Sequence, residues 1–475
     1  MSTSQGGDPF SVADAQIHSV TDNGAWCWFQ DERAIIDTAG NRALIGAVAS
    51  RGGKDGDRRG GDIDLHVVDL GSGAAQTVVL HAGLESDDHD DPALWLRSDG
   101  RFLAVYSRHK TDELTRWRIS EPGDPTTWGP EQSFDWVGDL FGSREAAEAA
   151  GGGRGVTYQN LHQLDGVLYC FVRAINDDPC YLVSRDEGST WQFGGRLLHR
   201  EKIGYVNGYA RYASGARFGG FGQGPDDRID VIITEHHPRD FANSIWHGYL
   251  AGGSLHRADG TVVSALGRGL EDPTPRAEDL TRVFASGSTW GGSVMTHAWT
   301  TDLRRFPDGT LVAILTARAD DAVGTGTARP AWDAPADEFE PIAHRFFRGV
   351  LRPGEDKWEV RELADAGPQL MPHEEDYTGL ASIDPDDPDA LWLSAVTDPR
   401  DGRALDRHEI FHGRTADGGE SWTWTPVTER SEVDNFRPIA IPGDPSRQIL
   451  TWYRGGMKAS QDYDAEVLLR VAGRG

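Results

Sequence analysis

The sequence predicts an all-β fold, a single-domain seven-bladed β-propeller, on three observations. Glycine (58 residues) and tryptophan (16 residues) are abundant in the 475-residue chain, which is typical of tight turns and of the faces of sheets. Amphipathic helical periodicity is scarce, and one short helix is expected at Ser143 to Ala150. A turn followed by a short β-type apolar run recurs seven times along the chain, which indicates a repeated sheet unit.

The seven apolar runs share a polar or charged terminus. They end at Arg51, His109, Arg173, His237, Arg318, Asp398 and Arg454. These ends lie about 56 to 81 residues apart, which suits four strands and their loops in each unit. Because equivalent strand ends of a propeller converge on one face, the six basic or imidazole ends predict a local positive site for an anionic ligand.

Two further segments share one turn pattern. Ser184 to Trp191 reads SRDEGSTW, and Thr415 to Trp422 reads TADGGESW. We interpret both as Asp-box turns, in which the aspartate accepts hydrogen bonds from turn amides and glycine supplies a permissive backbone. Such a turn stabilises a hairpin, so no catalytic role is expected for it.

One domain is expected, in which the N-terminus completes the last blade. Residues 1–21 form the predicted N-terminal segment, and residues 22–475 form the propeller. We expect Gln16 to Val20 to lie beside the final run, Ala465 to Val471, because a propeller ring is closed most simply by pairing its two ends.

Composition narrows the class of partner and the location. The formal net charge is −28, which disfavours binding to nucleic acid and to anionic membranes. No run approaches the ~18 apolar residues of a membrane span. Cys27, Cys170 and Cys180 show neither a disulfide framework nor metal-ligand spacing, and the N-terminus lacks the features of a signal peptide. We therefore expect a soluble, cytoplasmic protein, and the sequence leaves its oligomeric state open.

The stretch SDDHDDPAL, from Ser86 to Leu94, has two interpretations. It is either a solvated acidic loop or a setting that raises the basicity of His89 for proton transfer. A turn at residues 98–100 makes the chain between His89 and His109 a hairpin, and a hairpin brings its open ends together. By the same geometry Tyr158 and Arg173 should be neighbours. The two hairpins predict two imidazoles and a tyrosine–arginine pair at one rim.

Several motifs together resemble a known family. The motifs are DNGAWCWFQDERAI, DDHDDPAL, YSRH, the tyrosine-to-arginine hairpin, EHHP followed by NSIWHGY, EEDYTGL and DNFRPI. In this order they resemble the BNR-repeat (Asp-box) polysaccharide lyases, seven-bladed propellers that include ulvan lyases and L-rhamnose–D-glucuronate lyases. The similarity runs from about Asp22 to the C-terminus.

The resemblance implies a function and a set of site residues. It implies that the substrate is an anionic oligosaccharide or polysaccharide, and that His89, His109, Tyr158 and Arg173 form the catalytic site. For the substrate-binding set we expect Arg51, Asn160, Arg211, His237, Arg318 and Arg454. No cofactor is expected for catalysis. Some members carry a structural metal ion, calcium or zinc, for which His237 and His247 are candidates, but no cysteine is near them for a zinc site of histidine–cysteine type.

The residue types suit β-elimination from a glucuronate. A base removes H5 beside the carboxylate, whose developing charge Arg173 would neutralise, and an acid protonates the leaving O4. H5 and O4 lie on the same face of the sugar, so base and acid must lie on one side. Tyr158 can serve as the acid, or as both, and either His89 or His109 can serve as the base.

Two other functions fit the same fold. A sialidase-like hydrolase would need a tyrosine nucleophile activated by a carboxylate, and Glu374 or Glu375 near Tyr377 is a candidate set. A non-catalytic carbohydrate-binding propeller would bind an oligosaccharide and leave it intact. A new ultraviolet absorbance from an unsaturated uronate would distinguish the lyase from both.

Overall fold

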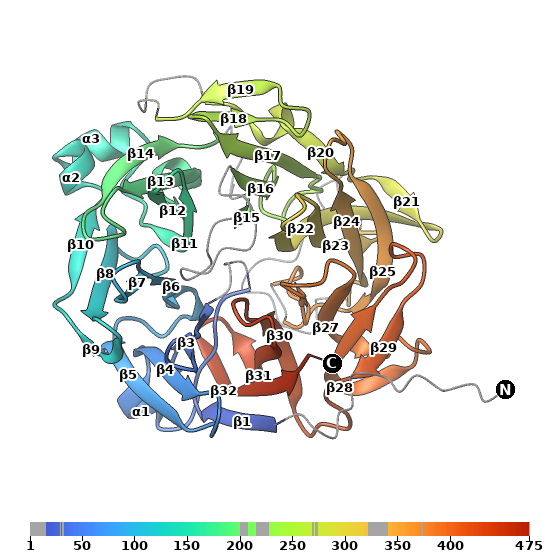
Figure 1. The fold of residues 1–475 in the computed structure, drawn as a ribbon. Coiled ribbons are helices and arrows are strands. Elements are labelled where there is room, and N and C mark those ends of the chain that lie inside the picture. Colours follow the sequence, from blue (N-terminus) through green and yellow to red (C-terminus); the bar gives the residue numbers. More distant parts are fainter. Residues whose placement is uncertain are drawn as a thin grey trace.

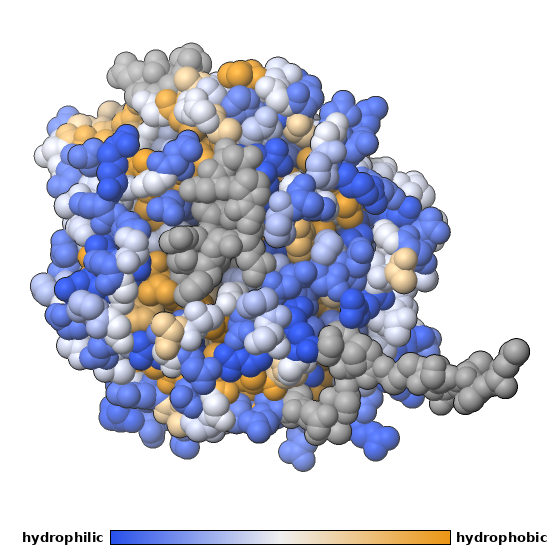
Figure 2. Space-filling model, viewed as in Figure 1, coloured by the Kyte–Doolittle hydropathy of each residue, from blue (hydrophilic) through white to orange (hydrophobic). Residues whose placement is uncertain are grey.

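The computed structural model confirms the all-β prediction. It describes residues 16–28, 30, 33–199, 208–214, 228–267, 270, 274–321, 341–371 and 374–474. Within these residues seven antiparallel sheets form a ring of seven blades around a central axis (Figure 1). Hydrophilic residues cover most of the face seen in Figure 2, as expected for a highly charged chain.

The blades are numbered here in chain order, and each is built from consecutive strands. Blade 1 contains β2 (Ala34–Asp37), β3 (Arg42–Val48), β4 (Ile63–Asp69) and β5 (Ala75–His81). Blade 2 contains β6 (Ala93–Leu96), β7 (Phe102–Tyr106), β8 (Leu114–Glu121), β9 (Asp124–Trp128) and β10 (Gln132–Asp135). Blade 3 contains β11 (Thr157–Leu164), β12 (Val167–Arg173), β13 (Pro179–Ser184) and β14 (Gln192–Arg196). Blade 4 contains β15 (Ala210–Ser214), β16 (Ile229–Thr234), β17 (Ile245–Ala251), β18 (Ser254–His256), β19 (Val262–Ala265) and β20 (Thr281–Phe284).

The remaining blades follow the same order, and the last one takes a strand from the N-terminus. Blade 5 contains β21 (Ser288–Trp290), β22 (Ser293–Arg305), β23 (Leu311–Ala319), β24 (His344–Leu351) and β25 (Glu359–Gly367). Blade 6 contains β26 (Ala381–Ile383), β27 (Ala390–Thr397), β28 (Ala404–Arg414) and β29 (Thr423–Pro426). Blade 7 contains β30 (Asp434–Ala440), β31 (Arg447–Ala459), β32 (Asp462–Gly473) and β1 (Gln16–Thr21).

Helices in the described residues are short. They are α1 (Gly56–Arg59), α2 (Gly138–Phe141) and α3 (Arg144–Ala149), with single 3-10 turns η2 (Asp88–Asp90), η3 (Ile175–Asp177) and η4 (Ala277–Asp279). Helix α3 lies in the segment predicted to be helical. The side chain of Ser143 caps it by accepting a hydrogen bond from the Ala146 N–H at 3.2 Å. No helix among the described residues is long and apolar enough to cross a bilayer.

The seven predicted runs occupy equivalent strands. They are β3, β7, β12, β16, β23, β27 and β31, and each pairs with the strand that precedes it in its blade. Their carboxyl ends therefore face the same side of the ring. The turn after β13 has the predicted chemistry, since the carboxylate of Asp186 accepts hydrogen bonds from the Thr190 N–H at 2.8 Å and its hydroxyl at 2.7 Å.

The ring closes through the two ends of the chain. Strand β1 pairs antiparallel with β32, with Gln16 opposite Val471 and Ser19 opposite Leu468 (Figure 1). This pairing lies where we expected it. The first fifteen residues of the predicted N-terminal segment lie outside the described residues.

A chain segment after β1 enters the centre of the ring. Trp26, Cys27 and Trp28 are fully buried, and they pack in a cluster with side chains from blades 1, 3, 4, 5, 6 and 7. The indole N–H of Trp28 donates to the carbonyl of Thr378 at 2.7 Å, across 350 residues of sequence. The axis is therefore filled by this segment, whose described residues 22–28, 30 and 33 we call the central segment, and not by blade strands alone.

Candidate active site

Two histidines of blade 2 are stacked. His89 lies in η2, just before β6, and His109 follows β7, whose pairing with β6 sets Ala93 opposite Val105. The imidazole centroids are 3.8 Å apart and the rings are inclined by 8°. The β6–β7 hairpin thus brings its open ends together, and with them the two imidazoles.

One carboxylate holds both imidazoles. Asp87 Oδ1 lies 2.6 Å from His89 Nδ1, and Asp87 Oδ2 lies 3.0 Å from His109 Nδ1. The side chain of Gln461, from blade 7, donates to the same Oδ2. Because the Nδ1 of each ring faces a carboxylate, the Nε2 of each ring is directed away from Asp87.

The two imidazoles differ in charge. Burial alone would lower the pKa of His89, but the acidic side chains around it, Asp87 and Asp88 among them, hold that pKa well above its usual value. Burial lowers the pKa of His109 to about 4, and the charge of the neighbouring His89 acts in the same direction. Near neutral pH His89 is therefore protonated and carries a positive charge, whereas His109 is neutral.

The acidic stretch around His89 is buried, so its interpretation as a solvated loop is wrong. Asp88, Asp90 and Asp91 have no exposed surface. Burial raises the pKa of Asp88 and of Asp91 to about 6, although Arg33, at 2.9 Å, opposes the shift of Asp91. Asp88 lies 2.8 Å from His89 Nδ1, and its charge is one of those that raise the pKa of this imidazole.

Tyr158 is presented by a bulge in the innermost strand of blade 3. Thr157 pairs with Arg173 and Asn160 with Phe171, so Tyr158 and Gln159 together oppose a single residue, Val172. Tyr158 has a φ of 66°, a left-handed conformation that is rare for a bulky residue. A positive φ also occurs near the start of the inner strands of blades 5, 6 and 7, at His297, Leu380 and Arg437. The bulge re-aims the tyrosine ring toward the axis.

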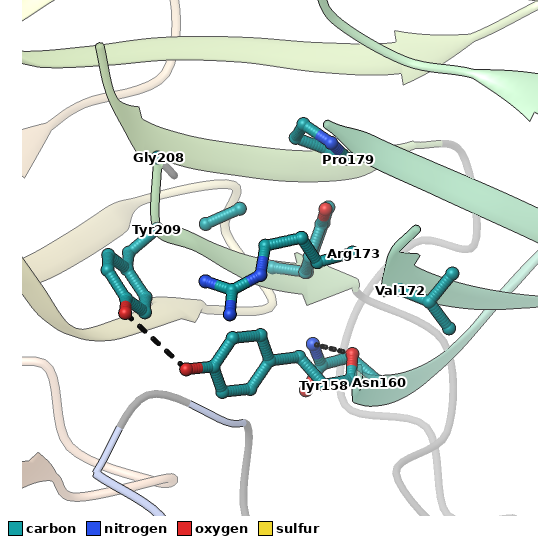
Figure 3. A pocket seen from close by; sticks show the side chains of 9 residues that line it. Tyr158, Asn160, Val172, Arg173, Pro179, Gly208 and Tyr209 are labelled. Carbon is teal, nitrogen blue, oxygen red and sulfur yellow. Dashed lines mark hydrogen bonds between the residues drawn. The ribbon is translucent and has the colours of Figure 1, made fainter. Parts of the chain in front are cut away.

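Arg173 and Tyr158 form one group with the histidines. The Arg173 guanidinium lies 4.5 Å from the centre of the Tyr158 ring and 5.6 Å from that of Tyr209, between the two tyrosines (Figure 3). The Tyr158 ring centre is 5.4 Å from that of His89 and 6.1 Å from that of His109. A small cavity of about 20 Å³, room for about one water, adjoins Tyr158, Arg173 and Tyr209. Burial raises the pKa of Tyr158 well above its usual value, so its hydroxyl stays protonated.

A polar chain continues from Tyr158 into blades 4 and 5. The Tyr158 hydroxyl lies 3.5 Å from that of Tyr209, which in turn lies 3.0 Å from His237 Nε2. Asp376 connects this chain to blade 5, since its carboxylate is 3.9 Å from His237 Nδ1 and pairs with Arg318. His237 and Arg318, both expected at the site, are thus joined to it through Tyr209 and Asp376.

Two other expected residues hold the central segment. Arg211 donates to the carbonyls of Trp28, at 3.1 Å, and Gln30. The amide oxygen of Asn160 accepts from the Arg33 guanidinium at 3.4 Å. Gln30 in turn donates to the carbonyl of His89 at 3.1 Å. Arg211 and Asn160 are therefore placed to position the site through the central segment.

Three strand ends do not join this cluster through any contact of the described residues. Arg51 is exposed and lies in the turn after β3, with its N–H on Ser86 Oγ at 3.1 Å. Arg454 lies inside β31, which continues to Ala459, and pairs with Glu466 of β32 at 2.7 Å. Asp398 is buried and pairs with Arg400 at 2.8 Å. These three ends thus share the side of the ring but not the contacts of the cluster, because strand length and turn shape differ between blades.

His237 and His247, the expected metal pair, have different neighbours. His247 Nε2 lies 3.0 Å from Asp230 and its ring contacts Trp358, whereas His237 faces Tyr209. Two other groups of described residues place three potential ligand atoms within 4.8 Å. They are Cys27 with Asp88 and His89, and Asp87 with His89 and His109.

Sequence reasoning missed Asp87, Tyr209 and Asp376 as members of the site. Asp87 belongs to the acidic stretch around His89, but its role as a bridge depends on both histidines. Tyr209 precedes the first strand of blade 4, where its carbonyl accepts from the Thr234 N–H at 3.1 Å. Aligning the first strands of blades 3 and 4 would have placed it next to Tyr158. Nothing near Asp376 in the sequence indicates its pairing with Arg318.

Comparisons with known proteins agree with this fold. No protein-family model matches the chain, and no curated protein matches it. Among solved structures, an ulvan lyase of polysaccharide lyase family 25, bound to a glucuronate–rhamnose 3-sulfate unit, has a TM-score of 0.60 at 14% identity, with 94% of each chain covered. The polysaccharide lyase Uly1 has a TM-score of 0.55 at 12% identity, covering 97% of this chain and 99% of that one. At these identities the likeness shows a shared propeller fold.

Proposed function

We propose that this protein is a saccharide lyase that cleaves the bond between L-rhamnose and D-glucuronate by β-elimination and leaves an unsaturated uronate. The observation that carries the proposal is a stacked pair of imidazoles, one charged and one neutral, on one aspartate beside Tyr158 and Arg173. The likeness of the fold to ulvan lyases, one of them bound to a glucuronate–rhamnose unit, supports it.

The substrate carboxylate needs a cationic partner. Removal of H5 places negative charge on the carboxylate of the glucuronate, and that charge must be neutralised for the proton to leave. Arg173 offers a planar guanidinium that can donate two parallel hydrogen bonds to it. The imidazolium of His89 is a second cation at the same rim. Both lie in a buried setting where a charge interaction is stronger than in water.

His109 is the better candidate for the base. It is neutral, and its Nδ1–H donates to Asp87, so the lone pair on Nε2 is free to accept a proton. It is also the more exposed of the two histidines, at 23% of its side-chain surface against 4% for His89. The base accepts H5, the C–H electron pair forms the double bond between C4 and C5, and the bond from C4 to O4 breaks.

Tyr158 is the candidate for the acid. Its hydroxyl stays protonated and can donate its proton to the departing O4 of the rhamnosyl group. Tyr209 and His237 follow it in hydrogen-bonding range and can return a proton to the tyrosinate. The Tyr158 and His109 ring centres are 6.1 Å apart, close enough for both to act on one face of the sugar, as removal of H5 and O4 from the same face requires.

The hydrolase alternative has less support. The hydroxyl of Tyr377 lies 3.4 Å from Ser460 Oγ, and the Tyr377 ring stacks on Trp28 at 5.0 Å. Glu374 pairs with Arg239 at 3.3 Å. The tyrosine and the carboxylate that a sialidase-like mechanism would combine are thus each held by other groups.

The test is a panel of oligosaccharides in which rhamnose is attached to O4 of glucuronate. The protein should produce an ultraviolet absorbance, and mass spectrometry should show a product lacking one water relative to hydrolysis. New reducing ends without absorbance would indicate a hydrolase. Binding without either product would indicate a carbohydrate-binding propeller.

A further inference from the structure

Two cations beside the candidate active site share one carboxylate. Lys110 directly follows His109, and its Nζ pairs with Asp177 Oδ1. Arg154 Nη2 lies 3.0 Å from Asp177 Oδ2. Among the described residues, Asp177 is the one acidic side chain that pairs with either cation. Two positive charges therefore share one negative charge. Asp177, which carries that negative charge, lies four residues after Arg173 in the sequence.

The local backbone is shaped to hold these groups together. Lys110 has a φ of 62° and Asp177 a φ of 58°, both left-handed and uncommon for residues with a side chain. Gly155, with a φ of 81°, packs so closely that a Cβ would come within 2.3 Å of the Lys110 carbonyl oxygen. The N–H of Lys110 donates to the Val156 carbonyl at 3.2 Å. This packing holds the backbone of Lys110 against Gly155, the residue that follows Arg154.

Three acids near the pair have cations of their own, and Glu85 accepts from the N–H of His109 and the hydroxyl of Thr111 instead. Glu113 pairs with Arg144 at 3.4 Å. Asp112 pairs with Arg116 and, at 3.6 Å, with Arg108. Asp178 lies 3.7 Å from Arg196 and 3.4 Å from His199. Burial and then the charge of Arg173 lower the pKa of Lys110 to about 8, which agrees with an excess of positive charge here.

We propose that Lys110 and Arg154 bind a second anionic group of the saccharide, a sulfate ester or a carboxylate on a sugar next to the glucuronate. This inference rests on the proposed function. Arg173 is 4% exposed, whereas the side chains of Lys110 and Arg154 are 18% and 36% exposed. Arg173 is thus placed for the uronate at the reacting carbon, and the outer pair for a group nearer the surface. Ammonium and guanidinium donors left over after Asp177 suit an oxyanion.

The experiment compares three probes that share the scissile bond. The first is rhamnosyl-glucuronate, with a single anionic group. The second carries a sulfate ester on the rhamnose, and the third carries a further glucuronate. Affinity is measured by calorimetry and turnover by ultraviolet absorbance, for the wild-type protein, Lys110→Gln and Arg154→Gln. Arg144→Gln is the matched control, because Arg144 lies in the same segment and pairs with Glu113 instead.

The wild-type protein should bind the probe with the matching second anion about tenfold more tightly than rhamnosyl-glucuronate. Lys110→Gln and Arg154→Gln should remove most of that preference through Kd and KM, with kcat nearly unchanged, while Arg144→Gln keeps it. Which of the two longer probes gains affinity distinguishes sulfate from carboxylate. Equal affinity for all three probes, a preference that survives in both variants, or no binding of any probe would overturn the inference. Binding with the preference but without unsaturated product would overturn the proposed function alone.

Discussion

At the scale of single residues, one aspartate sets the chemistry of two histidines. Asp87 presents one oxygen to each Nδ1, so the two imidazoles differ in charge although they are stacked. The difference arises because His89 has additional carboxylates around it, including Asp88 at 2.8 Å, whereas His109 is flanked by cations. Two like residues thus take different roles through their surroundings.

Replacing Asp87 by asparagine should shift the pH dependence of the reaction. The amide removes a negative charge that raises the pKa of His89, so His89 should lose its proton at lower pH. The alkaline limb of kcat/KM should therefore move to lower pH by about one unit or more. The acid limb is set by protonation of His109, whose pKa is about 4, and should stay below the neutral range. A folded variant whose alkaline limb is unmoved would show that Asp87 has only a structural role.

Tyr158→Phe should abolish turnover and leave binding largely intact. The change removes one hydroxyl and keeps the ring, so the packing against Arg173 is retained. Loss of a general acid typically lowers the rate ~10²–10⁴-fold, with the loss in kcat. Tyr106→Phe is the matched control, because Tyr106 is also buried and its hydroxyl donates to Glu131 at 2.7 Å. Steady-state kinetics measure the rate, and thermal melts show whether the variant is folded. A folded Tyr158→Phe variant with more than about a tenth of the wild-type rate would mean that Tyr158 is not the general acid.

Arg173→Lys should impair both binding and rate. Lysine keeps the charge but loses the planar fork that can hold a carboxylate by two bonds. KM should rise and kcat should fall, each by about tenfold or more. Arg97→Lys, at a turn of blade 2 where Arg97 pairs with Asp99 at 3.1 Å, is the control. An Arg173→Lys variant with unchanged KM would mean that Arg173 does not contact the uronate.

At the scale of elements, hairpins and one bulge place the catalytic groups, and the central segment holds them in register. The β6–β7 and β11–β12 hairpins each bring together residues that are 20 or fewer positions apart. The bulge in β11 then turns Tyr158 toward the axis. The central segment adds support from the other side, since Gln30 donates to the carbonyl of His89.

Arg211→Met should test the support from the central segment. Arg211 is 1% exposed, and its loss leaves the carbonyls of Trp28 and Gln30 with a hydrogen bond fewer. We expect a loss of about 2–4 kcal/mol in the free energy of unfolding and a lower kcat in the folded protein. Arg348→Met, which removes a buried arginine bound to the Pro388 carbonyl at 2.7 Å, should destabilise without lowering kcat. If Arg211→Met and Arg348→Met changed kcat equally, the central segment would have no role in positioning the site.

At the scale of the whole molecule, the ring is closed by a single strand from the N-terminus. Strand β1 covers the edge of β32, and its Val20 is buried in the central cluster. Closure removes an unpaired sheet edge and fixes blades 7 and 1 next to each other. The entry of the central segment, which follows β1 directly, depends on the same closure.

Truncations should separate ring closure from the residues that precede it. Removal of residues 1–15 keeps β1, whereas removal of residues 1–21 takes β1 away and exposes the edge of β32. The longer truncation should lower Tm by several degrees, because Tm falls by about 2–4 °C for each kcal/mol lost from the free energy of unfolding. It should also promote aggregation through the open edge of β32. Differential scanning calorimetry and light scattering would measure both. Equal melting temperatures for the two truncations would show that β1 contributes nothing to closure.

The sequence by itself determined the fold and the local pairs of the site. Seven similar runs set seven blades, because alternating apolar residues and turns specify each hairpin within a short stretch of chain. For the same reason the sequence pattern alone pairs His89 with His109, and Tyr158 with Arg173. These contacts depend on nearby residues, so sequence pattern is enough to predict them.

Only the tertiary structure decided which groups from other blades complete the site. Tyr209 meets Tyr158, Gln461 meets Asp87 across 374 residues, and Arg211 reaches the central segment instead of a substrate. Such contacts depend on how blades tilt and pack, which no repeat period specifies. The charge states of His89 and His109 also could not be predicted without the structure. The acidic stretch around His89 could have faced water, but it is buried, and burial decides which of the two imidazoles holds the proton.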